Sequence, residues 1–90
     1  MSTSAEAWLS HFPIRDQNML TAWFRRAVQQ GALTPDEVLV KVTVLLGQKL
    51  AWSVEPSSRL LVQETLVALR CGRQGALAFA AQILAEEGRS

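Results

Sequence analysis

The stretch from Thr34 to Trp52, TPDEVLVKVTVLLGQKLAW, constrains the fold more than any other part of the chain. It opens with Thr34 where a helix cap belongs, Pro35 at the first helical position, and the acids Asp36 and Glu37. This pattern is a capping box, in which the threonine hydroxyl accepts from the Glu37 amide and the Glu37 carboxylate reaches back to Thr34. Both acids also favour the positive end of the helix dipole. We therefore predict that a helix begins here.

The body of this stretch is apolar on almost every side. Val38 to Leu46 also alternates with a strand-like period of two. No other segment of matching length is available to pair with it, and a lone strand cannot satisfy its backbone. We therefore predict a helix that is buried among several neighbours and forms the centre of the fold. Gly47 predicts a close neighbour, because a glycine inside a helix costs about 0.5–1 kcal/mol relative to alanine.

The flanking segments predict further helices. Asp16 can cap a helix that runs to about Gln30, with Gly31 just after its end. Another helix starts either at Glu55–Pro56 or at Ser57 and ends near residue 71. The last helix spans about residues 74–87 and follows a short connection, which predicts that these two helices pair as an antiparallel hairpin.

The N-terminal residues 1–13 form a separate short segment. A second capping box at residues 3–6 predicts a short helix, which Pro13 ends. Trp8 and Phe12 share one face, so we expect this segment to dock on the core as a lid; the alternative is a segment that becomes ordered only with a partner. The chain as a whole is predicted to be one domain, residues 1–90, with an all-α fold. It is a compact bundle of four main helices plus the short N-terminal helix.

The composition is unusually apolar for so small a domain. Residues of the types AVILMFWYC make up 49% of the 90 residues, and charged residues make up 19%, against about 25% in typical domains. A small domain has a limited core and exposes much of its surface. Excess apolar surface indicates a bound protein partner or a second copy in a homo-oligomer.

Charge and cysteine content bear on the setting in which the chain acts. The net charge of +1 gives no bias toward nucleic acid or an anionic membrane. A single cysteine, no signal-peptide pattern and no apolar run of about 20 residues predict a cytoplasmic protein without a membrane segment. Arginine outnumbers lysine seven to two, a bias typical of GC-rich genomes, from which we predict a bacterial or phage origin.

The sequence contains few groups that could perform chemistry. His11 and Cys71 are the only residues of their types, and nothing in the sequence brings them together. We expect a surface histidine and a buried apolar cysteine. One histidine and one cysteine fall short of a zinc ligand set. The segment Gly72–Gly75 lacks the lysine and hydroxyl of a phosphate loop. We therefore expect no enzyme activity, no metal and no cofactor.

The function predicted from these patterns is protein binding, as an adaptor, a dedicated chaperone or an inhibitor. Two places on the chain offer apolar anchors for a partner. Phe79 and Ile83 point away from the face of their helix that is expected to be buried, although the N-terminal segment could cover them instead. Val40 and Val44 lie on a flat flank of the central helix, beside Gly47.

A helical nucleic-acid-binding protein is the alternative. Arg25, Arg26 and Gln29 lie on the exposed face of the second predicted helix, and Arg15 lies just before that helix. Arginine and glutamine are residue types that contact base edges. The overall charge lacks the basic footprint of most DNA-binding domains, which places this reading second.

Overall fold

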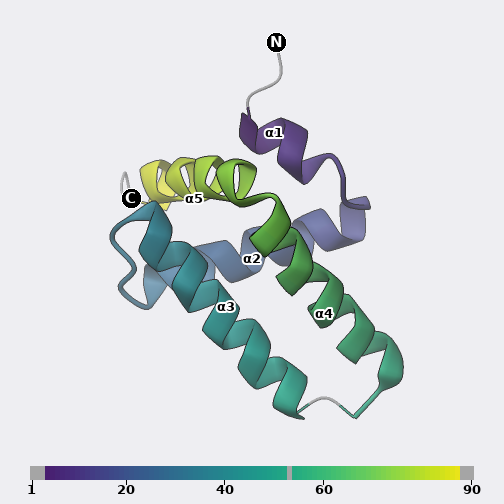
Figure 1. Ribbon diagram of the computed structural model, residues 1–90. Coiled ribbons are helices and arrows are strands. Elements are labelled where there is room, and N and C mark those ends of the chain that lie inside the picture. Colours follow the sequence, from purple (N-terminus) through teal and green to yellow (C-terminus); the bar gives the residue numbers. More distant parts are fainter. Residues whose placement is uncertain (1–3, 53, 88–90) are drawn as a thin grey trace.

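The computed structural model describes residues 4–52 and 54–87, and these residues form five helices and no strand (Figure 1). The helices are α1 Ser4–Leu9, α2 Ile14–Gln29, α3 Pro35–Trp52, α4 Pro56–Cys71 and α5 Arg73–Glu87. The predicted all-α bundle is confirmed, and the strand-like alternation within α3 does not produce a strand. The cap predicted at Thr3 lies outside the described residues.

The helix α5 contacts all four other helices, whereas α3 was predicted to form the centre of the fold. In Figure 1, α5 lies across one end of the bundle, with α1 packed against it. Ala76 and Ala80 on α5 are fully buried. Side chains this small let neighbouring helices approach closely, so an alanine-rich helix can pack among several others.

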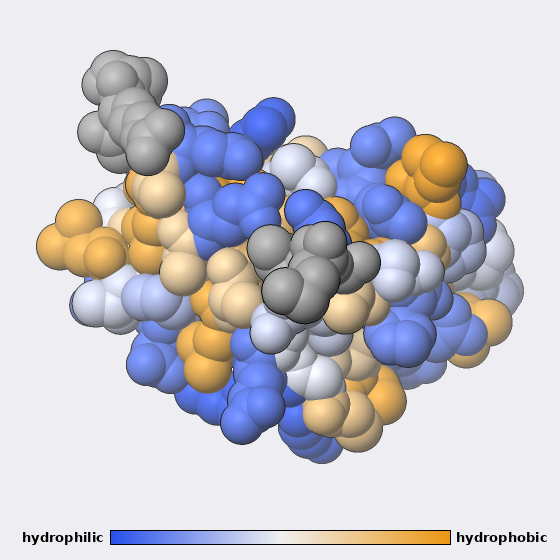
Figure 2. Space-filling model, turned by 90° about the horizontal axis from the view of Figure 1, so that it is seen from above, coloured by the Kyte–Doolittle hydropathy of each residue, from blue (hydrophilic) through white to orange (hydrophobic). Residues whose placement is uncertain are grey.

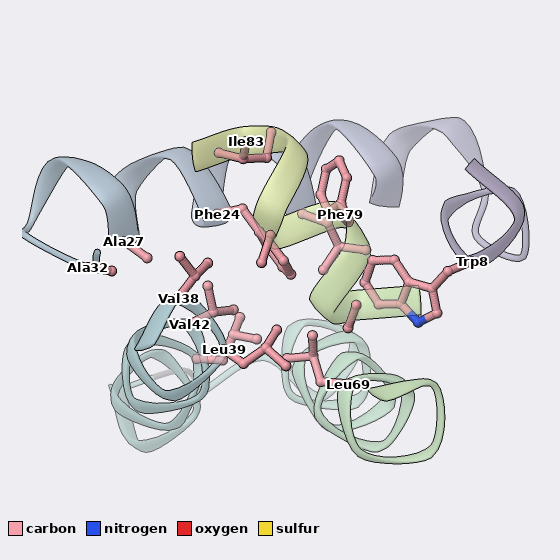
Figure 3. Close-up of a cluster of buried hydrophobic side chains, with 14 of the residues drawn as sticks. Trp8, Phe24, Ala27, Ala32, Val38, Leu39, Val42, Leu69, Phe79 and Ile83 are labelled. Atoms are coloured by element: carbon pink, nitrogen blue, oxygen red, sulfur yellow. The ribbon is translucent and has the colours of Figure 1, made fainter. Parts of the chain in front are cut away.

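An aromatic cluster joins α1, α2 and α5 within the hydrophobic core (Figure 3). The Phe24 and Phe79 rings lie 4.8 Å apart, and the Trp8 ring lies 5.9 Å from Phe79 and 6.1 Å from Phe24. Phe12 adds an edge-on contact to Trp8 at 5.2 Å. The described part of the N-terminal segment therefore docks on the core of its own chain, through Trp8 and Phe12.

Trp8 fits against two glycines. A Cβ atom added at Gly72 or at Gly75 would overlap the Trp8 side chain. For Gly75, the overlapping atoms are the Cβ and Cγ of Trp8, which rotation of the ring cannot move away. These two glycines therefore allow α1 to pack directly on the start of α5.

The helix caps around α3 form largely as predicted. The Glu37 amide donates to the Thr34 hydroxyl at 3.2 Å, while the Glu37 carboxylate accepts from the amide of Leu33 at 2.8 Å, one residue before the expected position. Gly31 follows α2 with φ +104°. Its amide donates to Val28, and the next amide, Ala32, donates to Ala27. This pair of bonds is a Schellman motif, which needs a left-handed residue at Gly31.

The start of α2 differs from the prediction. Pro13 occupies the cap position, and its carbonyl accepts from the amides of Asp16 and Gln17 at 2.9 and 3.0 Å. Asp16 is therefore the third residue of the helix, where it is 8% exposed and 3.6 Å from Arg15. Proline is well suited to a helix start because its φ is already fixed near the helical value.

Of the two predicted starts for α4, the structure has the first, with Glu55 as the cap and Pro56 as the first helical residue.

The connection between α4 and α5 differs from the prediction. Gly72 alone links α4 to α5, but the two helices diverge from it (Figure 1). Most contacts of α5 are with α1, α2 and α3. Antiparallel pairing is therefore limited to the turn, because Trp8 and the core draw α5 across the bundle.

Burial of α3 is one-sided. Val38, Leu39, Val42 and Leu46 are buried, whereas Val40 and Val44 are 63% and 50% exposed. The prediction that this helix is buried on nearly every side is wrong. Its neighbours α2, α4 and α5 all pack on the side of the buried residues, and none of the helices in the described part of the chain covers the other side.

Gly47→Ala is expected to stabilise the protein by about 0.5–1 kcal/mol, because alanine restricts the unfolded chain more than glycine does. The predicted close neighbour of Gly47 is absent, since an added Cβ atom would meet nothing within 4 Å in the described structure. Urea denaturation followed by circular dichroism measures the change. A loss of stability would show that something packs against this position after all.

Candidate partner-binding surface

Phe79 and Ile83, predicted as partner-binding residues, are core residues. They are 4% and 1% exposed. The α5 sequence offers two apolar faces of similar strength, and docking of Trp8 selects the face that carries Phe79. The alternative that the N-terminal segment covers this face is thus the one observed. Figure 2, viewed from the side where α1 and α5 lie, shows apolar areas separated by polar side chains.

The exposed side of α3 carries a stripe of small apolar residues, which we call the α3 ridge. It consists of Val40, Val44, Gly47 and Ala51, all exposed. Their spacing of four, three and four residues keeps them on one helix face. Two of the residues predicted to bind a partner, Val40 and Val44, therefore lie on the surface.

A groove of ≈ 480 Å³ lies on one side of the ridge, between α3 and the end of α2. Val40 and Val44 form one wall, and Gly31 and Ala32 contribute to the other. The Schellman turn positions this second wall, because it brings the chain back beside α3. Asp36, Glu37 and Lys41 also line this groove.

A second groove, of ≈ 330 Å³, lies between α3 and α4, and we call it the α3–α4 groove. Leu39, Thr43 and Gly47 line it from α3, and Leu66 and Leu69 from α4. Because Gly47 has no side chain, the groove stays open along this part of α3.

Two arginines lie at the edge of the α3–α4 groove: Arg70, in the last turn of α4, and Arg73, the first residue of α5. Arg73 donates to Asp36 on α3 at 2.7 Å. Sequence analysis missed both residues as candidates. Arg70 lies four residues after Leu66 on the same helix face, but only the packing of α4 against α3 shows that this face borders a groove.

Other large apolar side chains are exposed near the connection between α3 and α4. Trp52 is 86% exposed and Val54 is 91% exposed. On α4, Leu60 and Val67 are 56% and 57% exposed. Ile14 on α2 and Leu33 before α3 are 75% and 80% exposed. The excess of apolar residues in the composition thus appears as surface on α2, α3, α4 and the connections between them.

The basic residues of the nucleic-acid alternative are brought together with acids or aromatic rings. Arg25 lies 3.8 Å from the carboxylate of Glu86 and 3.7 Å from that of Glu87. The Arg26 guanidinium lies over the Trp23 ring at 5.8 Å. The acids belong to α5, so the sequence of α2 alone could not reveal this neutralisation.

The two remaining residues of this alternative lie apart from each other. Arg15, at the start of α2, is paired with Asp16 at 3.6 Å. Gln29, at the other end of the helix, is exposed. Because Arg15 and Arg25 are paired with acids, the exposed face of α2 carries less net positive charge than predicted from its arginines alone.

His11 and Cys71, which no sequence pattern connected, line one small pocket together with Trp8 and Phe12. Cys71 is exposed, contrary to the prediction of a buried cysteine, because it is the last residue of α4 and lies at the surface. Within residues 4–52 and 54–87, no group of three or more histidine, cysteine, aspartate or glutamate side chains has a geometry that could hold a metal ion.

Among the described helices, none is both long enough and apolar enough to cross a membrane. Comparison with protein-family models, curated proteins and solved structures gave no match to this chain. The assignment of function therefore depends on the surface itself.

Proposed function

We propose that this chain is a small helical protein-binding module, such as an adaptor, a dedicated chaperone or an inhibitor. The α3 ridge is the observation that supports this proposal. Val40 and Val44 are both exposed and lie about one helical turn apart on α3, and an open groove lies on each side of them. An apolar ridge between grooves, bordered by charged residues, has the anatomy of an interface core with its polar rim.

The partner is another protein or a second copy of this chain. A single exposed cysteine fits a reducing compartment such as the bacterial cytoplasm, where a free thiol persists. Nucleic-acid binding through the α2 arginines is the second candidate, and the ion pairs of Arg25 with Glu86 and Glu87 count against it.

The variant Val40→Gln with Val44→Gln is expected to stay folded and to bind its partner at least tenfold more weakly. The fold should persist because both side chains are exposed, and surface substitutions usually change stability by less than about 0.5 kcal/mol. Binding should weaken because each amide would be buried in the interface without a partner, at about 1–3 kcal/mol. Partner capture from a nuclease-treated lysate of the native host, followed by titration of the purified partner, measures this.

Val67→Gln is the matched control, since Val67 is a similarly exposed valine on α4. It should bind the partner as the wild type does. Equal binding by the α3 double variant would contradict the proposal. Recovery of the partner only while nucleic acid is present, and its loss in Arg25→Ala with Arg26→Ala, would favour the alternative.

A further inference from the structure

We infer that the α3–α4 groove binds a short amphipathic segment of the partner protein, in which an acidic side chain lies next to apolar ones. This inference rests on the proposed function and names the chemistry of the partner. It is supported by two independent properties of the groove, its apolar lining and the sign of the charge at its edge.

The lining is apolar where a segment would insert. Leu39, Leu66 and Leu69 supply the apolar surface, and Gly47 leaves the space above it open. A volume of ≈ 330 Å³ lies at the small end of the range of about 300–1,000 Å³ for ligand pockets. The groove can thus take a few side chains of a segment, which favours a peptide over a nucleic-acid backbone.

The charge at the edge selects an acidic partner. The lining includes Arg70 and Arg73 and no acid. Among the described residues, Arg70 makes no ion pair or hydrogen bond, so its whole guanidinium is available to a partner. Arg73 uses one nitrogen for Asp36 and keeps other donors. Paired guanidinium donors bind a carboxylate with defined geometry, which gives both affinity and orientation.

The α5 helix adds to this preference. Arg73 is its first residue, so the positive end of the α5 dipole lies at the same end of the groove. A carboxylate that reaches Arg70 would therefore meet positive charge from both arginines and from the helix. We expect the acid of the bound segment at this end and its apolar side chains toward Gly47.

A random library of twelve-residue peptides displayed on phage tests the inference with purified full-length protein. The wild type should enrich peptides that carry an aspartate or glutamate within about one helical turn of two apolar residues. The variant Arg70→Glu should not enrich them. An enriched peptide, synthesised with a fluorescent label, should bind Arg70→Glu about tenfold or more weakly than wild type, as loss of a charge-assisted hydrogen bond predicts.

Charge reversal makes the test specific. The same peptide with its acid replaced by lysine should bind Arg70→Glu more tightly than it binds the wild type. Arg26→Glu removes an equal charge from α2 and should leave peptide binding unchanged. Gly47→Leu should fold, because the groove has space for the side chain, and should abolish binding by filling it.

The inference would be overturned by enrichment of peptides without an acid, or by no enrichment at all. It would also be overturned by a peptide affinity that is insensitive to Arg70→Glu, or by occupation of the groove by an oligonucleotide or a second copy. Titration with labelled DNA and sedimentation equilibrium of wild type and Gly47→Leu detect the last. If partner binding still depends on Val40 and Val44, such a result rejects this inference and leaves the proposed function intact.

Discussion

Phe79→Ala is expected to destabilise the protein by about 3–5 kcal/mol, as truncation of a buried aromatic residue does. The Phe79 ring is almost fully buried and contacts the rings of Phe24 and Trp8. Its loss would leave a cavity where α1, α2 and α5 meet. Because small domains have only about 5–15 kcal/mol of stability, we expect a large fall in the urea midpoint, measured by circular dichroism.

Trp52→Ala is the control for this prediction, since Trp52 is also a large aromatic residue but is 86% exposed. It should change the free energy of unfolding by less than about 0.5 kcal/mol. If Phe79→Ala instead kept the wild-type stability and lost a partner, the interpretation of Phe79 as an interface anchor would be restored.

Gly75→Ala is expected to displace α1 and to destabilise the fold by about 1–3 kcal/mol, the usual cost of overpacking. The new methyl group would overlap the Cβ and Cγ atoms of Trp8, so the backbone of α1 must move. Hydrogen exchange in residues 4–9 should become faster, which mass spectrometry of peptic fragments measures. The unfolding midpoint should fall in parallel.

Gly47→Ala provides a matched comparison, because both substitutions add one methyl group to a helical glycine. The two variants should change stability in opposite directions, since the Cβ at Gly47 meets no atom within 4 Å. Unchanged protection of α1 in Gly75→Ala would mean that Trp8 does not hold α1 through this contact.

Only part of the candidate site could be predicted from the sequence. That Val40 and Val44 share a face with Gly47 follows from helix geometry alone. That this face is exposed depends on the packing of α2, α4 and α5 on the other side of α3. That Phe79 is buried depends on which of the two apolar faces of α5 the Trp8 side chain covers. The sequence did not predict that Arg70 and Arg73 border a groove, because this groove forms only where α4 packs beside α3.

The sequence by itself determined the helices and most of their ends. Local features set these ends: the capping box of Thr34 and Glu37, the left-handed conformation of Gly31, and Pro56 at the start of α4. Each depends only on residues close in the chain. Such interactions are nearly independent of the rest of the molecule. The sequence also determined the buried face of α2, because only one side of that helix is apolar.

Tertiary structure alone decided how the helices lie against one another. Helices with apolar residues on several faces, such as α3 and α5, have more than one way to be buried. The choice between these ways depends on shape, such as the fit of Trp8 against Gly72 and Gly75. It also sets which charges meet, as Arg25 meets Glu86 and Glu87. These contacts join residues far apart in the chain, so no local pattern encodes them.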